Sequence, residues 1–128
     1  MIVHQNENVK ITFDQSKKRL VQQWEGFASS QVFREAIDKT CDFVKKNDVK
    51  TIMSDTLRQN VVKPDDADYA ASVIPTMVNN GLKAMAFVVP ENVFTKLALD
   101  KFKSSIEGET TKYFMSKAEA EKWLDMQQ

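Results

Sequence analysis

Histidine and cysteine, which supply many metal ligands and nucleophiles, are almost absent from this chain. It has one of each, His4 and Cys41. One cysteine excludes an intrachain disulfide, and this pair is too few for a zinc site with the usual ligand set. A Ser-His-Asp or Cys-His set would need His4 to fold back from an N-terminus that we expect to fray. We therefore predict no metal, no other cofactor and no enzyme, although an Asp and a Lys in a buried site would still be able to act.

Glycine and excess charge of either sign are also scarce. The three glycines lie far apart, which excludes a Gly-rich phosphate loop, and no repeat or linker is visible, so we expect one domain over residues 1–128. Eighteen basic and eighteen acidic side chains give a formal net charge of zero. This balance argues against a nucleic-acid binder and does little to oppose self-association. No positively charged start precedes an apolar run, so we expect no membrane span and a cytoplasmic location.

Alternating and continuous apolar runs predict a sheet. The expected strands are residues 9–14, 19–27, 49–54, 83–89 and 111–115. The first two alternate or are rich in apolar residues on either side of a turn, which indicates an antiparallel hairpin. The fourth is apolar on both faces, as in a central strand of a parallel or mixed sheet. We therefore expect a mixed sheet of about five strands.

Helical periodicity predicts helices between and after these strands. The first helix begins after an N-cap at Ser29 or Ser30 and ends near Asn47, with an apolar stripe that includes Cys41. A second begins at Pro64, and because Pro75 lies inside it we expect a kink there.

Two further helices complete the prediction. The third covers residues 92–105, and the fourth follows Ser116, which has the capping-box spacing with Glu119. The expected order is ββαβαβαβα, an α/β fold with helices packed on the sheet.

Several short motifs resemble the SpoIIAA-like (STAS-like) family of small bacterial domains. They are Trp24-Glu25-Gly26-Phe27, Phe33-Arg34-Glu35-Ala36, Asp55 after the third strand, Lys83-Ala84-Met85-Ala86-Phe87-Val88, and Phe114-Met115 with Glu119-Ala120 and Trp123-Leu124. Together they span nearly the whole chain. The resemblance implies a single STAS-like domain that regulates or contacts other proteins, often as a dimer. The chain is most similar to the uncharacterised branch of the family, which is sometimes likened to lipid-transfer domains.

In the family's anti-sigma-factor antagonists, a partner kinase phosphorylates a serine just after the third strand, within an Asp-Ser/Thr-Gly motif. Here Thr56 follows Asp55, but no glycine follows it, and the next helix does not begin until Pro64. Thr56 therefore matches the phosphoacceptor only loosely, and whether it is phosphorylated stays open.

The candidate binding residues lie around the end of the third strand. They are Asp55, Thr56, Arg58, Lys63 and Tyr69. In open α/β sheets, ligands and partners meet the carboxyl ends of the strands, where Asp55 is expected. Residues 56–63 form a long predicted loop, and Tyr69 lies on the kinked helix beside it. A purely structural role is the alternative, in which Asp55 accepts local backbone hydrogen bonds and Arg58 pairs with a nearby Asp.

Two function hypotheses follow. The first is a non-enzymatic regulatory or protein-interaction module, expected as a homodimer that uses the predicted loop and the kinked helix. The alternative is a carrier or sensor of a small apolar, lipid-like ligand between the sheet and the second and third helices. For that cavity the candidate lining residues are Met77, Met85, Phe94 and Phe102, although apolar residues at such spacing are equally expected in an ordinary core.

Overall fold

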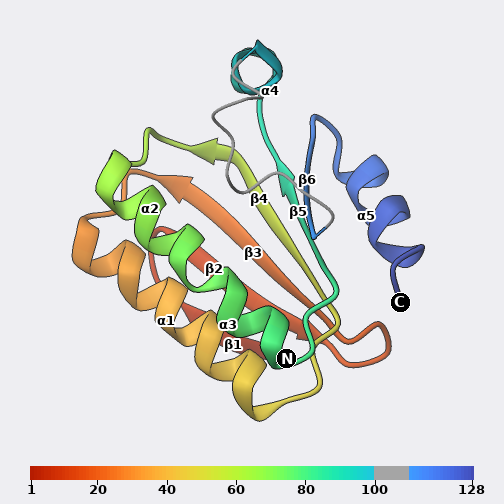
Figure 1. Cartoon of the computed structure of the whole chain (residues 1–128). Coiled ribbons are helices and arrows are strands. Elements are labelled where there is room, and N and C mark those ends of the chain that lie inside the picture. Colours follow the sequence, from red (N-terminus) through yellow and green to blue (C-terminus); the bar gives the residue numbers. More distant parts are fainter. Residues whose placement is uncertain (100–109) are drawn as a thin grey trace.

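The computed structural model describes residues 1–99 and 110–128, which contain a six-stranded sheet (Figure 1). The strands are β1 (Ile2–Gln5), β2 (Val9–Asp14), β3 (Arg19–Gly26), β4 (Thr51–Gln59), β5 (Ala84–Val88) and β6 (Thr111–Phe114), side by side in that order. The first three pair antiparallel, and β3 to β6 pair parallel. The predicted mixed α/β sheet is confirmed, with one strand more than expected.

Helices cover both faces of the sheet (Figure 1). The helices α1 (Ser30–Lys46), α2 (Pro64–Ser72) and α3 (Ile74–Asn79) lie together on one face, and α5 (Lys117–Asp125) packs on the other. The helix α4 (Glu91–Leu99) follows β5 beyond the carboxyl end of that strand. Each face therefore has its own layer of helix to bury apolar side chains.

Alternation along β4 divides the core into two. Ile52 is buried in a cluster under α1, which also includes Leu20 and Met85, whereas Met53 is buried in a second cluster with Leu124 of α5. Neighbouring residues of a strand point to opposite faces, so each position of β4 has a defined side.

Local signals set several element ends. The Ser29 hydroxyl accepts a hydrogen bond from the Val32 N–H at 3.3 Å, and the Ser116 hydroxyl accepts one from the Glu119 N–H at 3.4 Å. Both are the N-caps that the sequence predicts. Gly26 ends β3 with a φ of 70°, a left-handed conformation that favours glycine.

Two of the strand predictions were wrong. The N-terminus, expected to fray, forms β1, in which Ile2 pairs with Thr12 and His4 with Ile11 across an irregular register. Residues 56–59, predicted to begin a long loop, instead continue β4, because its end pairs with the end of β3. Both segments are short or polar and lack the alternation that marks a strand, so only pairing with a neighbour reveals them.

The helix predicted from Pro64 is two helices rather than one kinked helix. It breaks at Val73, and Pro75 lies in the first turn of α3, where a missing N–H costs no hydrogen bond. The third predicted helix begins at Glu91, one residue before its predicted start. Its predicted end, with Phe102, lies outside the described residues.

Candidate functional site

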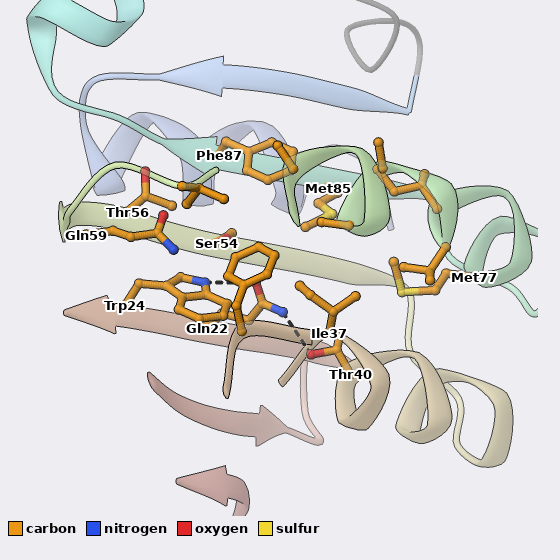
Figure 2. Close-up of a pocket in the computed structure, with 17 residues that line it drawn as sticks. Gln22, Trp24, Ile37, Thr40, Ser54, Thr56, Gln59, Met77, Met85 and Phe87 are labelled. Atoms are coloured by element: carbon orange, nitrogen blue, oxygen red, sulfur yellow. Dashed lines mark hydrogen bonds between the residues drawn. The ribbon is translucent and has the colours of Figure 1, made fainter. Parts of the chain in front are cut away.

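A partly enclosed cavity of about 160 Å³ lies between the sheet and the helices α1, α2 and α3 (Figure 2). Its wall is mainly apolar and includes Trp24, Phe33, Ile37, Met77, Met85 and Phe87. No charged side chain of the described residues lines it. Protein interiors are otherwise close-packed with few voids larger than a water molecule, so this cavity is the leading candidate site.

The floor of the cavity is a row of side chains across three strands. Ser54 of β4 pairs in register with Gln22 of β3 on one side and with Phe87 of β5 on the other. Cross-strand neighbours share a face of the sheet, and Figure 2 draws all three on the cavity side. Gln22 and Ser54 are each only 2% exposed. Two polar side chains are thus buried at the base of an apolar cavity.

One of these polar side chains belongs to a chain of hydrogen bonds. The Trp24 indole N–H donates to Gln22 Oε1 at 3.3 Å, and Gln22 Nε2 donates to Thr40 Oγ1 at 2.8 Å (Figure 2). The Thr40 hydroxyl in turn donates to the Ala36 carbonyl of α1 at 2.9 Å. These bonds fix the Gln22 amide against α1 and satisfy the buried Thr40 hydroxyl.

A β-bulge in β4 shapes the open end of the cavity. Gln23 pairs with Asp55 and Glu25 with Arg58, so β4 has one residue more than β3 over this stretch. As a result Thr56 and Gln59, three positions apart, both line the cavity. With Val62 they also line a groove at the carboxyl end of the sheet, and we call these three residues the mouth.

Small side chains on α2 leave the space open. Ala67, Ala70 and Ala71 line the cavity at helical spacing. A methyl group at each position covers the sheet without filling the gap to Ser54 and Met85. The cavity is therefore a consequence of side-chain volume on the covering helix.

Polar contacts hold α2 against α1 above the cavity. The carboxylate of Asp66 accepts hydrogen bonds from the Ser30 hydroxyl at 2.8 Å and from Arg34 Nε at 2.9 Å. These bonds, the Ser30 bond first, lower the pKa of Asp66. The Tyr69 hydroxyl donates to Asp38, which raises the pKa of Tyr69 because that bond favours the neutral phenol. The Arg34 guanidinium lies 4.8 Å from the centre of the Tyr69 ring.

The structure divides the five predicted site residues among three places, with Asp55 and Arg58 in one groove, Thr56 and Lys63 in another, and Tyr69 against α1. Only Thr56 lines the cavity, and its hydroxyl donates to the Val88 carbonyl at 2.8 Å. The Asp55 side chain points to the opposite face of the sheet, where its Oδ2 lies 3.5 Å from Lys117 Nζ. On that face a polar groove is lined by Asp55, Arg58 and Lys117. Lys63 lines the groove next to the mouth, while Tyr69 contacts α1.

The alternative structural role suggested for Asp55 has direct support. Its Oδ1 accepts a hydrogen bond from the Leu57 N–H at 3.1 Å, within the bulged part of β4. Its ion-pair partner is Lys117 rather than Arg58. Asp55 therefore shapes the local backbone and ties β4 to α5.

The cavity's buried polar residues, Gln22, Thr40 and Ser54, were missed from the sequence. A signal was present, since Leu20, Gln22 and Trp24 occupy successive inward positions of one strand and the middle one is polar. Ser54 likewise follows three buried residues of β4. A polar residue at an inward strand position indicates either a satisfied core network or a ligand contact.

Comparisons with known proteins bear on the fold. No family model and no curated protein matches the chain. Among solved structures, the chain is similar to an uncharacterised protein of the DUF3478 family from Shewanella loihica PV-4, described as having a SpoIIAA-like fold. The two share 15% identity with a TM-score of 0.60, over 94% of this chain and 98% of that one. Because the match extends over nearly all of both chains, this chain has the SpoIIAA-like fold that its motifs implied.

Proposed function

We propose that this chain is a non-enzymatic STAS-like module that binds a small apolar molecule in the cavity between the sheet and α1 to α3. The observation that carries the proposal is an apolar space of about 160 Å³ inside an otherwise packed core. An apolar cavity of roughly 150 Å³ is known to stay dry and to accept benzene. Of the two sequence hypotheses, the geometry favours the ligand carrier or sensor.

The chemistry of the wall supports binding rather than catalysis. Its polar side chains are amides and hydroxyls, which have no strong base beside them among the described residues. Cys41 lies on the buried face of α1, and burial raises the pKa of its thiol, which keeps it protonated. His4 lies on β1, the strand at the edge of the sheet, and β2 and β3 separate it from β4.

No helix of the described residues has the length and hydropathy to cross a membrane.

Toluene is a suitable probe because it is apolar and close in size to the cavity. We expect the thermal midpoint to rise with toluene concentration, since a ligand that binds only the folded state contributes RT ln(1 + [L]/Kd), about 2.7 kcal/mol at a hundredfold excess over Kd. The measurement is unfolding followed by circular dichroism, with 4-methylbenzoate as the charged control. A midpoint that does not move with toluene up to its solubility limit would contradict the proposal.

A protein-interaction module, in its simplest form a homodimer, is the second candidate. It is favoured by apolar side chains left exposed at the carboxyl end of the sheet, beside the mouth. Phe27 is 55% exposed, Val61 85% and Val93 37%, and all three line the same groove. Zero net charge does little to keep two copies apart, so we take the occupant of this groove to be a second copy of the chain.

Sedimentation at increasing protein concentration tests the homodimer. We expect a dimer that the double substitution Phe27→Ser and Val61→Ser converts to a monomer, because both changes remove apolar area from the groove. Met126→Ser is the matched control, since Met126 is 72% exposed at the other side of the molecule, after α5. A monomer at every concentration, or a dimer that resists the double substitution, contradicts the interaction surface.

A further inference from the structure

Ser54 differs from the other buried polar side chains of the cavity wall because its hydroxyl lies at the cavity surface without a hydrogen-bond partner among the described residues. Gln22, Thr40 and Thr56 are satisfied by hydrogen bonds to protein groups. Gln59 is half-buried at the mouth. Ser54 is 2% exposed, lines the cavity, and has no hydrogen-bond partner among the described residues.

A hydroxyl in an apolar cavity wall that has no protein partner carries a cost that a bound molecule relieves. A serine hydroxyl has one donor and two acceptor positions. Leaving them unused in a water-poor environment is unfavourable, whereas a ligand oxygen placed beside them restores a hydrogen bond. The amide of Gln22, next to Ser54 in the register, has a second N–H beyond the one that Thr40 accepts. The floor of the cavity thus offers a small polar site beneath an apolar wall.

The charge of the cavity wall further limits the chemical class of ligand that can bind. No cationic or anionic side chain of the described residues lines the cavity. An ionised ligand group at the floor would lose its hydration without gaining a countercharge, which costs far more than the loss of a neutral hydroxyl's hydration.

We infer that the cavity selects a small neutral molecule with a hydroxyl or carbonyl oxygen, which forms a hydrogen bond with Ser54 at the floor. This inference rests on the proposed function and adds the chemical class of the ligand and the residue that recognises it. Size and polarity together fit a single ring or short branched chain with one uncharged oxygen.

Two probes that differ by one hydroxyl, toluene and p-cresol, separate the inference from the proposed function. In the native chain we expect p-cresol to bind at least as tightly as toluene, although its hydroxyl must leave water. In Ser54→Ala we expect p-cresol to bind roughly fivefold to tenfold more weakly, with toluene nearly unchanged. Ser54→Thr, which keeps the hydroxyl, should retain p-cresol binding. Dissociation constants come from titrations of the folded protein, with folding checked by circular dichroism.

A matched control removes a buried hydroxyl that does not line the cavity. Thr111 Oγ1 on β6 is buried without a partner among the described residues, and Thr111→Val should leave both affinities unchanged. If toluene binds but Ser54→Ala leaves p-cresol unaffected, the inference is overturned and the proposed function stands. If 4-methylbenzoate binds more tightly than p-cresol, the neutral class is wrong. If neither toluene nor p-cresol binds, the proposed function fails, and the inference fails with it.

Discussion

Replacing Ser54 with isoleucine is expected to abolish toluene binding while leaving the protein as stable as before or more stable. The new side chain extends from the floor of the cavity into the space that toluene would occupy. We expect the affinity to fall at least about tenfold, because the apolar contacts of the ligand are replaced by those of the side chain. Each newly buried methylene contributes about 0.8 kcal/mol, and a β-branched residue suits a strand. Toluene titration and thermal unfolding of the same variant give both values.

The combination of lost binding and retained stability is what separates a filled cavity from a damaged fold. Overpacking a well-filled core costs roughly 1–3 kcal/mol, so a large loss of stability would mean that the space near Ser54 is not there. Thr111→Val serves again as the control, because it alters a buried hydroxyl that does not line the cavity and should keep toluene binding. Undiminished toluene binding to Ser54→Ile would place the ligand elsewhere.

Removing the carboxylate of Asp125 is expected to cost about 1–3 kcal/mol of folding free energy. Arg19 is buried on the α5 face, with its side chain 4% exposed, and its Nη2 lies 2.8 Å from Asp125 Oδ1. Its Nε donates to Thr51 Oγ1 at 3.0 Å. Asp125→Ala would leave this guanidinium without its countercharge, which is strongly unfavourable for a buried ion. The cost is reduced here because Asp125 itself is 48% exposed and screened by water.

A double-mutant cycle measures the contribution of the pair itself. In an Arg19→Met background, which removes the buried charge and keeps an apolar side chain, Asp125→Ala should have little effect. Urea unfolding of the native chain, both single variants and the double variant provides the four free energies. An equal cost of Asp125→Ala in both backgrounds would show that Asp125 does not act through Arg19.

The same pair predicts a dependence on pH. The hydrogen bond from Arg19 is the main reason that the pKa of Asp125 lies below its ordinary value. A carboxyl group whose pKa is lower in the folded than in the unfolded state contributes its full stability above the unfolded pKa, about 3.9, and loses it as pH falls through the folded pKa. The free-energy difference between the native chain and Asp125→Ala should therefore be constant near neutral pH and shrink below about pH 4.

The parts of the fold that follow from local chemistry were predictable. The hairpin of β2 and β3 alternates cleanly, and Ser29 and Ser116 cap their helices as their spacing indicates. The far end of β4 and the strand β1 were not predictable, because their polar or short sequences become strands only through pairing. The break at Val73 was predicted in part. Pro75 indicated where the helix is interrupted, but not whether it bends or divides into two helices.

The candidate site was predicted less well, for a physical reason. A sequence indicates which residues end a strand, and this led to Asp55 and Arg58, which lie on the face away from the cavity. A cavity depends on how the side-chain volumes of α2 and the sheet fit together, and this is a tertiary property. Met77 and Met85, considered for an apolar cavity, do line it. Phe94 is not among its lining residues, and Phe102 lies outside the described part of the chain.

The methionine methyl groups offer the most direct test that the cavity binds a small apolar molecule. Met77 and Met85 line the cavity, whereas Met53 is buried on the opposite face with Leu124. In a spectrum of the protein labelled with carbon-13 at the methionine methyls, toluene should shift the Met77 and Met85 signals in a saturable way and leave Met53 unmoved. Aromatic ring currents make such methyls sensitive to a bound ring at close contact. Unmoved Met77 and Met85 signals at saturating toluene, or shifts confined to exposed Met1 and Met126, would contradict ligand binding in the cavity.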